Sequence, residues 1–179
     1  MKQSKFGFTL VELLIVIALL GALAVGLLAA LDPFEQLKKG TDTGIRNTTS
    51  EIQGAVIRYY AIKNHMPWCA DDGTCPDGDP LSNKLTDEII STMITNLTSA
   101  GELKSNFMDL ADAYKNKIYI TGTAADENLQ VRVCFLPQAK SFRADPNTKY
   151  DATGIAVPAP VNCMGHGGAE TLTCYWCIM

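Results

Sequence analysis

One apolar stretch, residues 8–31, constrains the fold of this chain more than any other feature. Of its 24 residues, only Thr9, Glu12, Gly21 and Gly26 lie outside the apolar set. At ~1.5 Å rise per residue, a helix of this length spans about 36 Å, and a bilayer core is about 30 Å thick. Core helices of small soluble domains usually carry a polar face, which this stretch lacks. The sequence therefore predicts a helix that crosses a membrane or lies in an equally apolar environment.

The charges on either side of this stretch predict its orientation. Lys2 and Lys5 precede the stretch, and Asp32 and Glu35 follow it. The positive-inside bias places residues 1–7 in the cytoplasm and the rest of the chain outside it. A cleaved secretory signal is the rival interpretation, but its apolar region usually has only about 7–15 residues. The length of the stretch therefore favours an anchor.

Glu12 is the one acidic residue within the apolar stretch. An ionised carboxylate inside a membrane helix costs about 2.5–3.5 kcal/mol on insertion scales. We expect no partner for this charge within the helix itself. The sequence therefore predicts that Glu12 finds its partner elsewhere.

Residues 5–12, Lys-Phe-Gly-Phe-Thr-Leu-Val-Glu, resemble the start of a type IV pilin or pseudopilin precursor, with its class III signal peptide. The family pattern is a short basic leader ending in Gly, then Phe, a nearby Glu and a long apolar helix. This resemblance implies that a membrane peptidase cleaves after Gly7 and that Phe8 becomes the N-methylated N-terminus. It also implies that Glu12 pairs with the Phe8 amine of a neighbouring subunit during filament assembly.

The resemblance also implies a function. The chain would be a structural subunit of a pilus-like filament, held in the cytoplasmic membrane with its head outside until it joins an extracellular or periplasmic filament. The implied partners are copies of itself or other pilins, the prepilin peptidase, a membrane platform and an ATPase motor. A pseudopilin of a type II secretion or DNA-uptake system is the alternative. Adhesion, motility, DNA uptake and secretion all remain open.

The segment after the apolar stretch has the signals of a helix start. Asp32 can cap the helix, Pro33 suits its first position, and Glu35 can complete a capping box. Apolar or small residues then recur at helical spacing as far as Ile62. The sequence therefore predicts a kink or short break near residues 30–33 and a helix that continues to about Asn64.

The remaining residues predict a small α+β head. Residues 86–100 predict a second helix, with Thr86 as a plausible cap and Gly101 at its end. Strands are predicted at residues 117–123 and 129–137, joined as a hairpin, with further edge strands at residues 141–142 and 171–178. A long helical spine packed on a small antiparallel sheet is the expected fold class. The expected domains are a leader at 1–7, a transmembrane helix at 8–31, its amphipathic continuation at 32–64 and a head at 65–179.

All six cysteines lie in the predicted exported head: Cys69, Cys75, Cys134, Cys163, Cys174 and Cys177. An even number of cysteines outside the cytoplasm favours disulfides. The turn between Cys69 and Cys75 predicts that these two pair. On an extended strand, the Cα atoms of Cys174 and Cys177 would lie about 10 Å apart, beyond the reach of a disulfide. These two would then pair separately with Cys134 and Cys163.

Two metal sites are weaker alternatives in the head. Zinc could bind the set Cys163, His166, Cys174 and Cys177, which has plausible ligand spacing. Calcium could bind the oxygen-rich loop with Asp71, Asp72, Asp77 and Asp79, although a solvated acidic turn is the simpler interpretation. A membrane-anchored redox or metal-binding protein is accordingly the less favoured function. We expect no metal and no other cofactor.

Composition argues against two other classes. The chain has 15 basic and 19 acidic residues in 179, a net charge of −4, which disfavours nucleic-acid binding. The nucleophile-elbow, P-loop and dinucleotide-binding motifs do not occur in the sequence. We therefore expect a protein that is not an enzyme.

Overall fold

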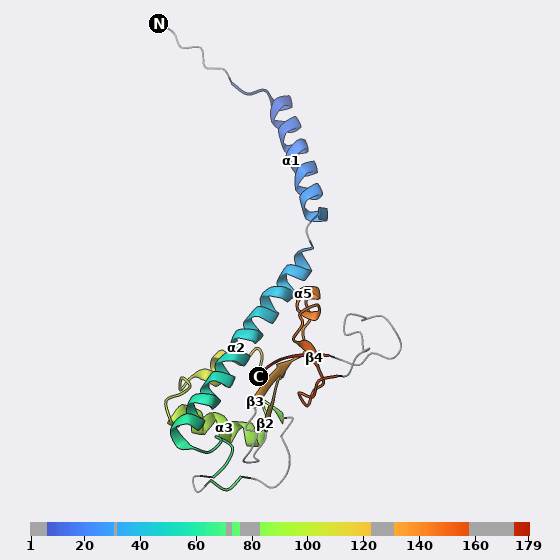
Figure 1. The fold of residues 1–179 in the computed structure, drawn as a ribbon. Helices are drawn as coiled ribbons and strands as arrows, with labels where there is room; N and C mark the ends of the chain where they lie inside the picture. Colours follow the sequence, from blue (N-terminus) through green and yellow to red (C-terminus); the bar gives the residue numbers. More distant parts are fainter. Residues whose placement is uncertain (1–6, 31, 71–72, 76–82, 123–130, 158–173) are drawn as a thin grey trace. The chain divides into compact units, whose positions relative to one another are not determined.

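The computed structural model describes residues 7–30, 32–70, 73–75, 83–122, 131–157 and 174–179. The chain divides into two compact units, Met1–Leu37 and Lys38–Met179. The first unit contains helix α1 (Leu10–Ala30) and the start of helix α2 (Pro33–Lys63). The rest of α2 belongs to the second unit, together with the sheet (Figure 1).

Helix α1 contains a span, Leu10–Leu28, that is long and apolar enough to cross a membrane, and no part of this span is buried. Helix α1 ends at Ala30 and α2 begins at Pro33, so the predicted break is confirmed. The local chemistry explains the restart, because proline at a first helical position lacks only an N–H that would be unpaired there. The Glu35 amide donates a hydrogen bond to Asp32 Oδ1 at 3.2 Å, so Asp32 caps the new helix.

Five strands form one antiparallel sheet in the order β1-β2-β3-β5-β4. The strands are β1 (Asn83–Lys84), β2 (Ile118–Gly122), β3 (Val131–Phe135), β4 (Thr148–Tyr150) and β5 (Tyr175–Ile178). The predicted hairpin is confirmed by the antiparallel pairing of β2 with β3 from Ile118 opposite Phe135 to Gly122 opposite Val131.

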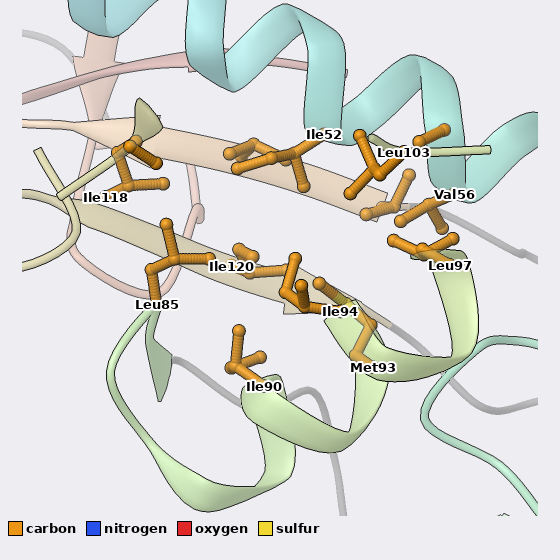
Figure 2. Packing of buried hydrophobic residues seen from close by; sticks show 14 of the residues in the cluster. Ile52, Val56, Leu85, Ile90, Met93, Ile94, Leu97, Leu103, Ile118 and Ile120 are labelled. Atoms are coloured by element: carbon orange, nitrogen blue, oxygen red, sulfur yellow. The ribbon is translucent and has the colours of Figure 1, made fainter. Parts of the chain in front are cut away.

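The hydrophobic core lies where α2 and helix α3 (Glu88–Ser99) meet the sheet, as Figure 2 shows. Ile52 and Val56 from α2 and Ile118 and Ile120 from β2 are almost fully buried. Helix α3 adds a row at helical spacing: Ile90, Met93, Ile94 and Leu97. This arrangement confirms the α+β class, with helix α2 packed on an antiparallel sheet.

The ends of α3 differ partly from expectation. The N-cap is Asp87 and not Thr86, and the Asp87 carboxylate accepts a hydrogen bond from the Lys84 amide at 2.7 Å. Gly101 ends the helix as predicted, with a φ of 78° that favours glycine. The Glu102 amide donates to the Leu97 carbonyl at 2.9 Å, which completes a Schellman motif.

The edge strand predicted at residues 141–142 is wrong, because these residues lie in a short helix, α5 (Lys140–Arg143). The amides of Gln138 and Ala139, just before α5, donate to a buried carboxylate of α2 instead of to a neighbouring strand. Phe142 packs its ring against Phe135 of β3. A long-range contact thus determines the local conformation here.

Candidate functional site

The N-terminal end of α1 is organised by a reciprocal pair of hydrogen bonds between Thr9 and Glu12. The Glu12 amide donates to Thr9 Oγ1 at 3.2 Å. In return, Glu12 Oε2 accepts hydrogen bonds from the Thr9 amide at 2.9 Å and the Thr9 hydroxyl at 2.8 Å. This arrangement is a capping box, which pairs N–H groups that a helix start otherwise leaves unpaired.

The capping box gives Glu12 two hydrogen-bond donors that sequence reasoning missed, but it supplies no opposite charge, so the expectation that the charge of Glu12 has no partner within α1 stays a prediction. Its carboxylate accepts two hydrogen bonds from a residue three positions earlier. The signal was present in the sequence, because a Thr followed three residues later by Glu, before an apolar run, is a capping-box pattern. Both of these hydrogen bonds reach Oε2, and the residue as a whole is exposed.

The residues at the predicted cleavage point are accessible. Gly7 is exposed, and the Phe8 side chain is 83% exposed. Both precede α1, which begins at Leu10. An extended, exposed segment beside a helix start is a suitable shape for a peptidase substrate, since no helical hydrogen bond has to open.

The described disulfides of the head are one local and one long-range cross-link. Cys69 bonds to Cys75 across the turn after α2, and Cys134 of β3 bonds to Cys177 of β5. Cys134 and Cys177 lie directly opposite each other in the sheet register. Cys174 is also disulfide-bonded, and Cys163 lies outside the described residues.

The two alternative metal sites gain nothing from the described residues. In the zinc set, Cys174 and Cys177 are disulfide-bonded and are not free thiolates, while Cys163 and His166 lie outside the described residues. All four residues of the calcium alternative, Asp71, Asp72, Asp77 and Asp79, also lie outside them. Within the part of the chain that the structure describes, no three acidic, cysteine or histidine residues gather to hold an ion.

A buried carboxylate that sequence reasoning missed fastens α2 to the rest of the head. Asp42 is 0% exposed, and its Oδ2 accepts hydrogen bonds from the amides of Gln138 at 2.8 Å and Ala139 at 2.7 Å. These partners lie 96 and 97 residues away in the chain, so no local sequence pattern predicts the contact. Two charge-assisted hydrogen bonds offset part of the cost of burying the carboxylate.

A second acid orders the turn after β4. Asp151 Oδ1 accepts hydrogen bonds from the Thr153 amide at 2.8 Å, the Thr153 hydroxyl at 2.7 Å and the Ile155 amide at 2.9 Å. Partial burial acts to raise the pKa of Asp151, but these hydrogen bonds and the nearby Arg132 charge together hold that pKa below its usual value. The carboxylate therefore stays ionised and keeps the turn closed.

Comparison with known proteins agrees with these features. Residues 2–28 match the prokaryotic N-terminal methylation motif, which covers the leader, Gly7, Phe8, Glu12 and most of α1. Beyond the motif, the chain is 30% identical over 128 residues to the fimbrial protein EcpC of Eikenella corrodens, a match that covers 70% of this chain and 80% of the relative. No solved structure matches the chain.

The match to the fimbrial protein extends far beyond the apolar helix, because 128 residues cannot fit within the methylation motif alone. The fold is the α+β arrangement expected for this family, since helix α2 packs on a five-stranded antiparallel sheet. The methylation motif and the match to a fimbrial protein over most of both chains show that the chain is a prepilin, a member of the type IV pilin-like family of structural proteins.

Proposed function

We propose that this protein is a structural subunit of a type IV pilus-like filament, cleaved after Gly7, N-methylated at Phe8 and assembled through α1. One observation carries the proposal above the others. The apolar span of α1 is wholly unburied, and Glu12 is its only charged residue. Such a surface is not stable in water, so the protein needs something else to cover it.

Two environments can cover α1 in turn. A bilayer matches its length and composition while the subunit waits, because all backbone groups of a helix are paired internally. A bundle of identical helices in a filament core offers the same apolar surroundings after assembly. Transfer between the two changes the energy of the apolar side chains little, so the charge of Glu12 becomes the group that distinguishes them.

The capping box refines the role proposed for Glu12. Thr9 donates two hydrogen bonds to Oε2 and so reduces the cost of holding the carboxylate in an apolar environment. Hydrogen bonds to a neutral hydroxyl and amide leave the negative charge uncompensated. The α-amine of Phe8 on a neighbouring cleaved subunit would neutralise it, which favours assembly and sets the axial position of one subunit against the next.

The second unit would supply the surface of the filament. It has its own hydrophobic core, and its disulfides cross-link the sheet and the turn after α2. We propose the cytoplasmic membrane as the site of storage and the cell surface as the final location, with a prepilin peptidase, a membrane platform and an ATPase as partners. The domain limits proposed for this role are 1–7, 8–31, 32–64 and 65–179.

The test is the intact mass and N-terminal sequence of the protein purified from its native cells. The proposal predicts a chain that starts at Phe8, with one additional methyl group. Recovery of that chain in sheared surface filaments would support the filament role. A protein that still starts at Met1 and stays in the membrane fraction would contradict it and leave α1 as a simple anchor.

A further inference from the structure

A cavity with a mixed polar and apolar lining lies in the second unit. It has a volume of about 290 Å³ and lies between α2 and the end of β5. Its described lining residues are Arg46, Ser50, Asn147, Trp176, Cys177, Ile178 and Met179. The Cys177 amide donates to the Asn147 carbonyl at 3.4 Å, which fixes the loop before β4 to β5 on one side of the cavity.

Arg46 supplies a positive charge in a fixed place. Its guanidinium carbon lies 5.1 Å from the centre of the Trp176 ring. Stacking of this kind holds the planar guanidinium by its face and leaves its N–H groups free at the edges. Among the described residues, no carboxylate lies within ion-pair distance of Arg46, in contrast to Arg58, which pairs with Glu102 at 2.7 Å.

Trp176 supplies a second unsatisfied donor. The residue is only 2% exposed, and its indole Nε1 has no hydrogen-bond partner among the described residues. Buried donors are paired in the great majority of cases, and an unpaired one costs about 1–3 kcal/mol. Arg46 and Trp176 both line this cavity. Arg46 is exposed, so its N–H groups can meet an acceptor that enters from outside, whereas the unpaired indole Nε1 of Trp176 is itself buried.

We propose that this cavity binds a carboxylate side chain from a neighbouring copy of the protein. Planar N–H donors match a carboxylate in a two-point contact. The volume of about 290 Å³ lies at the lower end of the range for small-molecule pockets and leaves room for a single side chain. This inference rests on the proposed filament function.

The charge of the chain and the position of Arg46 favour a neighbouring copy as the protein that supplies this carboxylate. The chain carries 19 acidic and 15 basic residues, so each copy presents more carboxylates than cations. Arg46 lies on α2, the helix that follows the segment proposed to form the filament core. In the proposed filament the second units of neighbouring copies pack against one another, so an acidic side chain of one copy can enter the cavity of the next.

The test uses coupling of a carboxylate to an amine by a carbodiimide, which links only groups already in contact. Arg46→Lys keeps the charge and provides the amine. Filaments are assembled from unlabelled Arg46→Lys subunits and 15N-labelled wild-type subunits, and cross-linked peptides are identified by mass spectrometry. Arg58→Lys is the matched control, because its partner Glu102 lies in the same chain.

The expected result is a link between Lys at position 46 of an unlabelled copy and an acidic residue of a labelled copy. The control should give a link to Glu102 within one copy. Filaments in which the control link forms, and position 46 couples to nothing or only to its own copy, would overturn this proposal and leave the filament function intact. Wild-type protein that forms no filaments would contradict the filament function itself.

A second variant measures the same contact without cross-linking. Arg46→Gln removes the charge, and the yield of sheared filaments should fall about tenfold while the amount of cleaved subunit in the membrane stays unchanged. Lys104→Gln is the control, since it removes an equal charge from an exposed position. Equal filament yields from Arg46→Gln and wild type would also overturn the proposal.

Discussion

Two carboxylates, one in each unit, are held by backbone N–H groups in opposite settings. Glu12 accepts from Thr9, three residues earlier, and is exposed. Asp42 accepts from Gln138 and Ala139, almost one hundred residues later, and is fully buried. The first carboxylate belongs to a unit whose apolar helix has no core of its own, and the second belongs to a unit with a complete core.

The difference indicates where each charge acts. Asp42 has its partners within the same chain, so its loss should affect the stability of the head. Glu12 receives hydrogen bonds from its own chain but no opposite charge, so its loss should affect assembly between chains. Substitutions at the two carboxylates should therefore separate an effect on head stability from an effect on filament assembly.

Glu12→Ala should insert into the membrane and be cleaved normally, yet give almost no filaments. The reason is that the substitution removes the only charge of α1 and with it the proposed pair to a neighbouring amine. Filament yield is measured by shearing and immunoblotting, beside the amount of cleaved subunit in the membrane. Glu35→Ala, which changes the equivalent first turn of α2, is the control. A wild-type yield of filaments from Glu12→Ala would show that the charge of Glu12 does not act between chains.

Removing the Cys134–Cys177 disulfide should destabilise the head by about 4 kcal/mol, because it closes a long loop in the unfolded chain. Removing Cys69–Cys75 should cost only about 2 kcal/mol, since that loop is short. Each pair is replaced by two serines, and unfolding of the full chain in detergent is followed by circular dichroism in denaturant. Equal losses from the two pairs would contradict the loop-length argument.

Asp42→Ala should lower the free energy of unfolding of the head by about 3 kcal/mol, since the buried Ala139 amide and the part-buried Gln138 amide lose their acceptor. Asp42→Asn keeps an acceptor oxygen and should lose less. The same denaturant experiment measures both, with cleavage at Gly7 as a check on export. An unchanged stability of the head in Asp42→Ala would contradict the stabilising role of Asp42 within its own chain.

Gly122→Ala should destabilise the head by about 1–3 kcal/mol, because an added Cβ would meet the Trp68 ring and force it to move. Gly40→Ala is the contrasting variant, since no neighbouring atom lies within 4 Å of its added Cβ. It should stabilise α2 by up to about 1 kcal/mol. Tryptophan fluorescence during unfolding reports both, and opposite signs are the expected result.

The smallest effect concerns pH. The pKa of Asp151 is lower in the folded head than in the unfolded chain, so this residue stabilises the fold above the unfolded pKa of about 3.9. That contribution, below about 1 kcal/mol, is lost as the pH falls through the folded value. Asp151→Asn should reduce the difference in stability between pH 6 and pH 2.5. If the difference in stability between pH 6 and pH 2.5 is unchanged in Asp151→Asn, other carboxyl groups account for the whole pH dependence.

Local patterns predicted much of the fold. The periodicity of the segments from residue 34 to 62 and from 86 to 100 indicated both helices, and the strands predicted at 117–123 and 129–137 contain β2 and β3. Strands β1 and β4, with two and three residues, are too short to give a pattern of their own. They exist because longer strands beside them offer free hydrogen-bonding groups.

The same contrast between local patterns and long-range contacts holds for the functional residues. Gly7, Phe8 and Glu12 stand in one contiguous motif, and the sequence also held the Thr9 signal that explains how Glu12 is capped. The contact of Asp42 and the stacking of Arg46 on Trp176 could not be foreseen, because each joins segments more than 90 residues apart. Such contacts follow from sheet register and helix packing, which local patterns do not specify.

The covalent link between β3 and β5 has a mechanical consequence. These strands are neighbours within the sheet, and β1 and β4 are its short outer members. If the proposed filament is pulled, tension that reaches the sheet can peel β1 or β4 away by breaking a few hydrogen bonds. It cannot separate β3 from β5 at the cross-link without breaking a chemical bond. The head should therefore yield at its edges, keep its centre and recover its shape when the load is released.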